Sequence, residues 1–294
     1  MLYIVVLLCI VIIFLLIYIF LQQRRIQTII NQVNHILFQQ QDFYKQHFKE
    51  GKLSLLENQI MKLVNRLSEQ NHMLQEDKLL MKQSLEDISH QMKTPLTSLN
   101  IINERLKYEP TKQLVKEQVR LLQKVEWLVA SLLKIAQLDA NVVAFQSENI
   151  SHQQLIHQLI DVFNLQLELK NIQIDYDIDD DDFCIDVLWT IEALSNILKN
   201  CIEHTPQDGS ISITTKHTPL YDEIIIQDNG EGIDNEDLPH LFERFYKGKN
   251  SSENSVGIGL ALSQMIIEKQ QGTIMVENTY PGARFTIHFY REVV

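Results

Sequence analysis

The apolar positions of the chain fall into three successive patterns, and the first is an unbroken apolar run. Residues 1–21 carry no charged side chain, and Gln22, Gln23, Arg24 and Arg25 follow them. Twenty helical residues at about 1.5 Å each span the roughly 30 Å hydrocarbon core of a bilayer. The basic pair follows the run, and no Ala-x-Ala cleavage pattern is present, which favours an uncleaved anchor over a signal peptide. The positive-inside rule then predicts a single span of the cell membrane with the N-terminus outside, the rest of the chain in the cytoplasm, and no extracytoplasmic sensor domain.

The second pattern is a seven-residue apolar repeat that starts within residues 22–79. Between about residues 26 and 107 the only proline is Pro95 and the only glycine is Gly51, which favours one long helix. Residues 22–50 are rich in Gln and fit either a helix or a membrane-surface linker. The main repeat positions are apolar throughout: Leu53, Ile60, Leu67, Leu74, Met81 and Ile88. The companion positions turn polar towards their C-terminal end: Leu56, Leu63, Gln70, Asp77 and Ser84. This pattern predicts a dimerising coiled coil, and its polar end is compatible with a signalling helix that has two packings close in energy.

A second amphipathic stretch follows within residues 80–143. The segment Tyr108-Glu109-Pro110 interrupts the helical pattern. Apolar positions at helical spacing then resume: Leu114, Val115, Val119, Leu122, Val125, Leu128, Val129, Leu132, Leu133, Ile135 and Leu138. The pattern predicts a helical hairpin, and two hairpins would form a four-helix bundle in a homodimer.

The third pattern, over residues 144–294, mixes strands with helices. Apolar alternation predicts strands near residues 172–178, 211–215, 223–227, 273–277 and 284–289. Helical periodicity predicts helices near residues 151–169, 187–203 and 259–270. The expected architecture is an α/β sandwich in which helices back one sheet.

Composition and charge narrow the function classes. The 294-residue chain is 45% hydrophobic and 22% charged, which excludes a disordered chain, a collagen-like repeat and a multi-span membrane protein. Its formal net charge is -12, and residues 144–294 hold 9 basic and 25 acidic residues. This acid excess argues against nucleic-acid binding, which needs clustered Lys and Arg. The three cysteines, Cys9, Cys184 and Cys201, show no CxxC spacing and indicate neither a disulfide scaffold nor a metal site.

One histidine on the long helix stands in a chemically suggestive setting. His90 is two residues from the repeat position Ile88 and so points away from the seam, and Thr94 lies one turn further on the same face. Pro95 removes a backbone hydrogen bond and is expected to bend the helix there. A solvent-facing imidazole beside a hydroxyl is suited to covalent chemistry at nitrogen, although a surface histidine taken alone is more often idle.

Four elements of the C-terminal half carry candidate nucleotide chemistry, and each taken alone has a structural explanation. Asn196 and Asn200 place two carboxamides one turn apart on a helix, and carboxamide oxygens suit a hard cation. Asp228-Asn-Gly230-Glu-Gly232 follows a predicted strand, and its glycines allow close backbone approach, although such turns are common. The segment Leu241–Lys247 sets aromatic side chains beside two cations, a pattern that a core helix also shows. Gly257-Ile-Gly259-Leu260 opens a helix whose N–H groups would face phosphate oxygens.

In this order and at these separations, the segment Asp87–Ser98 and the four elements resemble the bacterial membrane-anchored sensor histidine kinases of two-component systems. The resemblance covers roughly residues 80–290. It implies the ATP-binding fold that these kinases share with gyrase-type ATPases, the Hsp90 chaperone and mismatch-repair ATPases, known as the GHKL type. It also implies that His90 is the phosphorylated residue and that Thr94 matches the position that orients water during dephosphorylation of a response regulator.

The resemblance assigns the nucleotide site in the same way. It implies that Asn200 is the ligand of Mg²⁺, that Asn196 lies near the phosphates of ATP, that Asp228 accepts from the adenine amino group and that Lys247 reaches phosphate. The remaining residues implied to bind the nucleotide are Gly230, Gly232, Gly257, Gly259 and Leu260. Residues 234–256 match the mobile lid of the family. Because the domain is acidic, we expect the nucleotide to depend on metal, backbone donors and few cations, with Arg244 as a second candidate beside Lys247.

The chain departs from the family pattern at two positions. The family usually has Glu or Asp directly after the phosphoacceptor, where this chain has Gln91, and a carboxamide cannot act as a base near pH 7. We therefore expect Gln91 to orient His90 while the proton leaves to water or to another acid, Asp87 being the nearest candidate. Many members also carry Lys three residues after the magnesium Asn, where this chain has Glu203 followed by His204.

The expected function is autophosphorylation of His90 from Mg-ATP and transfer to an Asp of a cognate response regulator, which the protein would also dephosphorylate. The alternatives are a phosphatase-only or pseudokinase membrane scaffold, in which Gln91 and Glu203 have removed kinase activity, and a gyrase-like or chaperone-like ATPase, which would not need the His90 helix. Input would come through the membrane helix, a membrane partner such as a transporter, or the Gln-rich segment. The acidic run Asp177–Asp182 fits a solvated loop better than a cation site.

Overall fold

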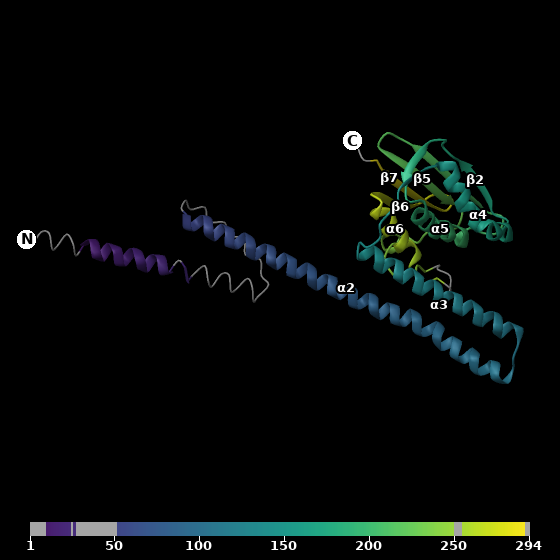
Figure 1. Ribbon diagram of the computed structural model, residues 1–294, viewed down its shortest axis with the longest axis horizontal. Coiled ribbons are helices and arrows are strands. Elements are labelled where there is room, and N and C mark those ends of the chain that lie inside the picture. Colours follow the sequence, from purple (N-terminus) through teal and green to yellow (C-terminus); the bar gives the residue numbers. More distant parts are fainter. Residues whose placement is uncertain (1–9, 25, 28–51, 250–254, 292–294) are drawn as a thin grey trace, which may run out of the picture. The chain divides into compact units, whose positions relative to one another are not determined.

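The computed structural model describes residues 10–24, 26–27, 52–249 and 255–291 (Figure 1). The chain divides into two compact units, Met1–Gln83 and Ser84–Val294. The second unit holds the predicted helical hairpin and the α/β domain, and it contains all the candidate site residues.

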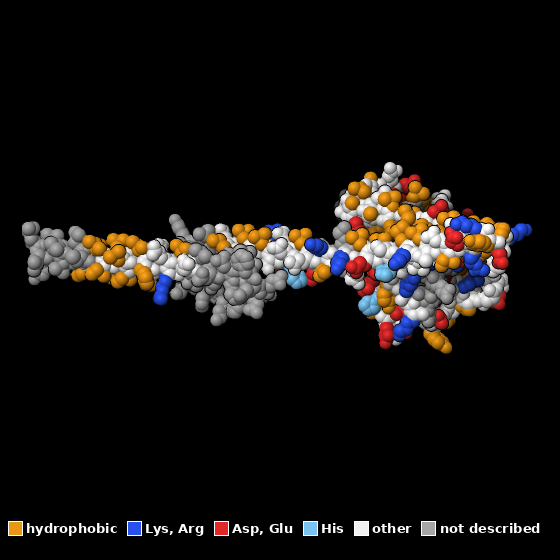
Figure 2. Space-filling model, turned by 90° about the horizontal axis from the view of Figure 1, so that it is seen from below, with side chains coloured by type: hydrophobic (Ala, Val, Ile, Leu, Met, Phe, Trp, Pro, Cys, Tyr) orange, Lys and Arg blue, Asp and Glu red, His pale blue; other side chains and the backbone are white. Residues whose placement is uncertain are grey.

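The N-terminal apolar run is only partly within the described residues. Residues 10–21 are helical, and their side chains are mostly apolar and exposed (Figure 2). Residues 1–9 of the predicted span, with Cys9, and also Arg25 lie outside the described part, as do residues 28–51. Among the helices that the structure describes, none combines the length and the apolar character needed to cross a membrane.

The long helix and the hairpin follow the apolar patterns. Helix α2 (Lys52–Tyr108) continues through Pro95, and helix α3 (Lys112–Asp139) begins after the N-cap Thr111, whose hydroxyl accepts from Leu114 N at 3.2 Å. The predicted interruption at residues 108–110 is therefore confirmed. The two helices share a small apolar cluster of Leu99, Ile102, Leu106, Leu114, Leu121 and Val125.

The apolar stripes of these helices are only partly covered within one chain. The repeat residues Leu63, Leu67 and Leu74 of α2 are 61%, 53% and 64% exposed. The side chains of Leu53, Leu56, Asp77 and Met81 lie outside the described ones. On the hairpin, large apolar side chains also stay exposed: Leu96, Ile101, Val115, Val119, Leu122, Val129 and Leu133.

The C-terminal domain is the predicted α/β sandwich. Its five-stranded sheet has the order β2 (Gln173–Asp177), β4 (Ser210–His217), β5 (Tyr221–Asp228), β7 (Ala283–Tyr290) and β6 (Gly272–Asn278). Strands β2 and β4 are parallel, and the other neighbours are antiparallel. The helices are α4 (His152–Lys170), α5 (Val187–His204) and α6 (Gly259–Lys269), with a short 3-10 helix η1 (Leu238–His240). The pattern-based strands and helices are thus confirmed to within a few residues.

Two short strands were not predicted from the pattern. Strands β1 (Glu148–Ser151) and β3 (Asp182–Ile185) pair antiparallel in a separate two-stranded sheet. Each has four residues, which is too short to display a period of two. β3 also begins at Asp182, the last residue of the acidic run, where the composition favours a loop.

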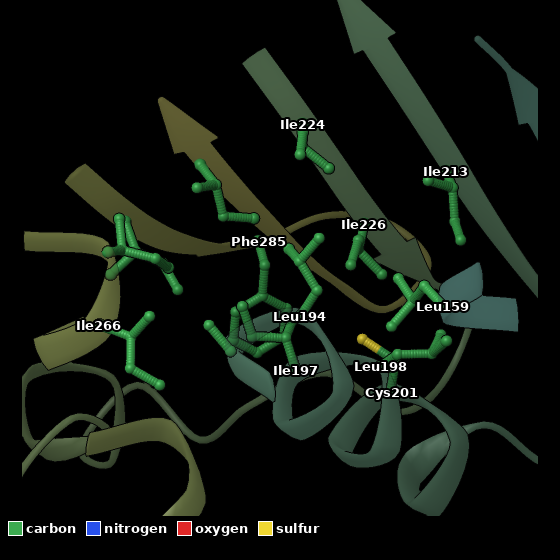
Figure 3. Close-up of a cluster of buried hydrophobic side chains, with 14 of the residues drawn as sticks. Leu159, Leu194, Ile197, Leu198, Cys201, Ile213, Ile224, Ile226, Ile266 and Phe285 are labelled. Carbon is green, nitrogen blue, oxygen red and sulfur yellow. The ribbon is translucent and has the colours of Figure 1, made fainter. Parts of the chain in front are cut away.

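The core lies between the sheet and its helices. Strands β4, β5 and β7 alternate buried and partly exposed residues, so one face of each carries the apolar side chains. Figure 3 shows side chains of this face, such as Ile226 and Phe285, directed towards Leu194, Ile197 and Leu198 of α5. Full burial of such side chains contributes about 1.5–3 kcal/mol each. Helix α5 is therefore rigidly placed on the sheet.

One buried titratable group stands out at the start of α4. The His152 side chain is fully buried and stacks on Phe183 with ring centroids 4.3 Å apart. Within the part of the chain that the structure describes, neither ring nitrogen has a hydrogen-bond partner, and Nε2 lies 3.6 Å from Asp222 Oδ1. Burial lowers the pKa of His152, and the nearby Asp222 carboxylate opposes this effect only in part.

This depressed pKa predicts a loss of stability in acid. Because the unfolded chain binds a proton below about pH 6.5 and the folded chain resists it, His152 contributes stability above that pH and loses it as the pH falls. When the pH is lowered from about 7.5 to about 5.5, the range in which an ordinary imidazole titrates, the melting temperature of the His152→Phe variant should fall less than that of the wild type. Thermal denaturation at both pH values measures the difference.

The exposed His157 of the same helix supplies the control. His157→Gln should leave the acid sensitivity of the wild type unchanged. An equal acid sensitivity in His152→Phe and His157→Gln would contradict the assignment.

Candidate nucleotide-binding site

A pocket of about 380 Å³ lies where α5, the segment after β5, the start of α6 and helix α3 meet. Seven of the residues predicted for the nucleotide line it: Asn196, Asn200, Gly232, Lys247, Gly257, Gly259 and Leu260. The pocket also takes lining residues from α3 that the sequence did not indicate: Arg120, Leu121, Gln123, Lys124 and Trp127. Residues far apart in the sequence thus surround one concave site, which is the usual form of a small-molecule site.

Helix α5 presents the two carboxamides. Its buried residues pack on the sheet, so Asn196 and Asn200 lie on the remaining face, one turn apart. The Nδ2 atom of Asn196 is buried and has no hydrogen-bond partner among the described residues. A buried donor without a partner costs free energy, so this atom is suited to a ligand oxygen in the pocket.

The C-terminal end of α5 is held by a lysine from α4. Lys170 Nζ donates to the carbonyls of Ile202, Glu203 and Thr205 at 2.7, 3.0 and 2.9 Å. A cation is favourable at this end of a helix because the last carbonyl groups are otherwise unpaired. The contact fixes the end of α5, where Glu203 and His204 also line the pocket.

Asp228 lies at the end of β5, behind the pocket. It is 4% exposed, and its Oδ1 accepts from Gly230 N at 2.9 Å and from Ala283 N at 3.3 Å. Cys201 is buried near the same carboxylate; burial, followed by the Asp228 charge, raises the pKa of its thiol well above the usual value. Asp228 and Gly230 are not among the residues that line the pocket.

The glycine at position 257 is required by the backbone. Gly257 has φ of +75°, and a Cβ there would lie 2.2 Å from Tyr246 O. Its carbonyl accepts from Phe245 N at 2.7 Å, which joins the predicted lid segment to the start of α6. Helix α6 begins two residues later at Gly259, and its N-cap residue Ile258 makes no side-chain hydrogen bond to the helix. The first N–H groups of this helix are therefore suited to an anion.

The beginning of the lid segment is tied by Asp237. Its carboxylate accepts from the Tyr246 hydroxyl at 2.6 Å and from Lys249 N at 2.9 Å. The hydrogen bond to Asp237 raises the pKa of Tyr246 to about 12. Lys249 Nζ pairs with Asp234 and Glu236 at 3.0 and 2.8 Å. Residues 250–254 of the predicted lid lie outside the described residues.

The two candidate lid cations are placed differently. Lys247 lines the pocket. Arg244 instead makes a two-pronged ion pair with Asp139 at the end of α3, at 2.9 and 2.8 Å, and also contacts Met265 Sδ at 3.3 Å. Arg244 does not line the pocket, and its ion pair with Asp139 holds the α/β domain against α3.

The phosphoacceptor candidate lies outside this pocket. The imidazole of His90 is exposed on α2, and the Thr94 hydroxyl donates to the His90 carbonyl at 3.3 Å. Gln91 is half-exposed, while Met92 packs against the main core. The geometry confirms that Thr94 lies one turn from His90, and it leaves the His90 ring accessible to solvent.

The acidic run is built into a turn. Asp179 accepts from His217 N at 2.9 Å and from Asp180 N at 3.1 Å, and the first of these bonds lowers the pKa of Asp179. No cluster of His, Cys, Asp and Glu that could hold a metal ion occurs among the described residues.

Comparison with known proteins finds relatives of this part of the chain. Residues 185–293 match the family model described as "Histidine kinase-, DNA gyrase B-, and HSP90-like ATPase". The chain is 28% identical over 210 residues to the heme sensor protein HssS of Staphylococcus saprophyticus, covering 70% of this chain and 45% of that protein. It is 28% identical over 209 residues to the sensor histidine kinase CusS of Escherichia coli O157:H7, and this match covers 68% of this chain and 43% of that protein. The chain thus spans less than half the length of these relatives.

A solved structure has the same fold. The Acinetobacter baumannii histidine kinase AdeS aligns with a TM-score of 0.62 at 21% identity, covering 69% of this chain and 98% of that one. The crystal structure of the histidine kinase ThkA in complex with the response regulator protein TrrA aligns with a TM-score of 0.62 at 20% identity, covering 74% and 63%.

The requirement for glycine at position 257 generates a prediction. In Gly257→Ala the new methyl group overlaps the Tyr246 carbonyl, and the residue must also keep a positive φ. If the pocket binds ATP as the sequence predicts, the α/β domain of this variant should bind it at least about tenfold more weakly, a change of ~1.4 kcal/mol. Isothermal titration of the full chain in detergent micelles measures the dissociation constant.

Thr273→Ala, at an exposed position of β6 that does not line this pocket, is the control and should bind within about twofold of the wild type, because a surface substitution of this kind changes little. Unchanged ATP binding by Gly257→Ala would show that the contact between Gly257 and residues 245–246 does not shape the site.

Proposed function

We propose that this relative of the two-component sensor histidine kinases phosphorylates its own His90 from Mg-ATP and passes the phosphoryl group to an Asp of a cognate response regulator. The observation that carries the proposal is the pocket in the ATPase domain. It gathers seven of the residues that the sequence resemblance assigns to the nucleotide, in the same compact unit as an exposed histidine.

The residues of the pocket fit ATP and Mg²⁺. The unpartnered Nδ2 of Asn196 and the uncapped start of α6 supply donors for phosphate oxygens. Asp228, fixed by two backbone N–H groups, would accept from the adenine amino group, and Gly230, Gly232 and Leu260 would border the nucleotide. Asn200 would hold Mg²⁺, which when bound neutralises charge on the phosphates during transfer.

The chemistry at His90 is a displacement at phosphorus. A ring nitrogen of His90 attacks the terminal phosphorus of ATP, a nitrogen–phosphorus bond forms, and the bond to the leaving ADP oxygen breaks. The proton on the imidazole leaves to water or to Asp87, because the carboxamide of Gln91 cannot take it. Gln91 would orient the ring by a hydrogen bond. Positioning supplies most of the catalysis in such transfers.

A response regulator completes the cycle. The phosphoramidate at His90 passes its phosphoryl group to a carboxylate of the regulator, and Thr94, one turn away, would orient the water that later dephosphorylates that carboxylate. Support comes from the structural likeness to ThkA, which was solved with a response regulator.

The apolar face of the hairpin supports a homodimer. Val115, Val119, Leu122, Val129 and Leu133 of α3 are each 46–59% exposed. A stripe of this kind is typical of a helix that packs against other helices. A second hairpin would cover the stripe in a four-helix bundle.

The anchor and the domain division complete the proposal. Residues 1–21 would span the cell membrane with Arg24 and Arg25 in the cytoplasm, and residues 22–79 would form the juxtamembrane and coiled-coil helix. Residues 80–143 would form the dimerisation and phosphotransfer domain, and residues 144–294 the ATP-binding domain. Input would then reach the kinase through the membrane helix, a membrane partner protein or the Gln-rich segment.

A phosphatase-only protein is the second candidate. Two observations favour it: Gln91 cannot act as a base, and Glu203 places a negative charge in the pocket. The experiment on His90 separates the two candidates.

Incubation of the full chain with radiolabelled ATP should give label that is stable in alkali and lost in acid, as expected for a phosphoramidate. His90→Gln should remove the label completely, because no other residue of the segment offers a ring nitrogen. His72→Gln, on the same helix, is the control and should be labelled like the wild type. Absence of label in the wild type together with dephosphorylation of a phosphorylated regulator would support the phosphatase candidate.

The role of Gln91 gives a further prediction. A carboxylate at this position can take the imidazole proton, and a positioned base contributes on the order of 10²-fold. Gln91→Glu should therefore raise the initial rate of autophosphorylation at least severalfold, measured by the same labelling. The control Gln83→Glu, an exposed position two turns earlier on α2, should have no effect. A rate that stays unchanged or falls in Gln91→Glu would refute the proton-acceptor argument.

A further inference from the structure

One wall of the nucleotide pocket comes from outside the ATPase domain. Arg120, Gln123, Lys124 and Trp127 of α3 line it together with residues of α5 and of the lid segment. Helix α3 belongs to the phosphotransfer hairpin of the proposed kinase. The pocket is therefore bordered both by the ATPase domain and by the phosphotransfer hairpin.

The ATPase side of the pocket is poor in available positive charge. Its lining cations are Lys199 and Lys247, against the carboxylates of Glu203, Asp234 and Asp237. Lys199 lies 4.0 Å from Glu203, and its ammonium group stands 5.5 Å from the ring centroid of Trp127. Lys199 thus has a carboxylate and an aromatic ring as neighbours. A triphosphate would find little net attraction from this side alone.

Helix α3 supplies cations and no carboxylate to the lining of this pocket. Arg120 and Lys124 are one turn apart and so lie on the same face of the helix, where Arg120 also pairs with Glu117 at 2.6 Å. Burial, and then the positive charges of Lys247 and Arg120, lowers the pKa of Lys124. Cations from α3 and from the lid segment therefore lie close enough to repel one another, and an anion bound among them would relieve this repulsion.

We propose that Lys124, with Arg120 beside it, binds the phosphate groups of the nucleotide in this pocket, so that helix α3 completes the ATP site. The inference rests on the proposed function, because it takes ATP as the ligand. Lys124 then supplies the positive charge that many members of the family carry at the position of Glu203. A triphosphate in the pocket also bridges the ATPase domain and α3, which the ion pairs Arg244–Asp139 and Lys134–Glu192 already join.

The contact makes nucleotide binding sensitive to the position of α3. ATP, with its full phosphate chain, would hold the domain against the helix more strongly than ADP. Adenosine, which has no phosphate, would not sense Lys124 at all. Affinities for this series of ligands therefore distinguish a phosphate contact from a packing role of Lys124.

The test measures dissociation constants of ATP, ADP and adenosine for the full chain in detergent micelles. Lys124→Gln should bind ATP about tenfold more weakly, equivalent to ~1.4 kcal/mol, and adenosine unchanged. The loss for ADP should be smaller than that for ATP. Lys124→Arg should recover most of the ATP affinity because it keeps the charge, and Arg120→Gln should show a smaller loss than Lys124→Gln.

Lys116→Gln is the matched control, because Lys116 is exposed on the same helix and does not line this pocket. Equal ATP affinity in Lys124→Gln and Lys116→Gln would overturn the inference, as would an equal loss for adenosine and ATP. If the wild type binds ATP and becomes labelled at His90 while the ATP affinity of Lys124→Gln is unchanged, only the inference fails. If the wild type does not bind ATP, the proposed function fails and the inference with it.

Discussion

The packing of α5 against the five-stranded sheet is the constraint on which the nucleotide site depends. Ala193, Leu194, Ile197, Leu198 and Cys201 are completely buried. Because they occupy the sheet-facing side of the helix, the intervening Asn196 and Asn200 must face the pocket. The same packing places the Cys201 thiol behind Asp228 and so links the helix to the end of β5. The positions of the carboxamides and of the carboxylate are thus consequences of core packing.

The elements of the α/β domain could be predicted from the sequence because each long strand and helix has its own period. Strands β4, β5 and β7 alternate over eight residues, and α5 repeats its apolar positions over 18. The four-residue strands β1 and β3 are too short to show a period. Their pairing depends on contacts between distant segments, which a local pattern does not contain.

The candidate site also has a part that the local sequence predicts and a part that depends on contacts between distant segments. The glycines and carboxamides could be found because their spacing reflects local backbone requirements, such as the positive φ at Gly257. The contribution of α3 could not, because Lys124 looks like any solvated lysine on an amphipathic helix until the fold brings it beside Lys247. Arg244 stands beside Lys247 in the sequence, yet its side chain pairs with Asp139. Only the tertiary structure distinguishes these two cations.

Helix α3 has two faces with different tasks, and the geometry of a helix links them. Val115, Val119 and Leu122 form an apolar face that a single chain leaves exposed, while Lys124 and Trp127 face the nucleotide pocket. Both faces belong to one rigid rod, on which successive residues are about 100° apart. Turning the rod to improve the packing of one face must sweep the other through the same angle. A rotation of helix α3 would therefore change the packing of its apolar face and the positive charge at the pocket at the same time.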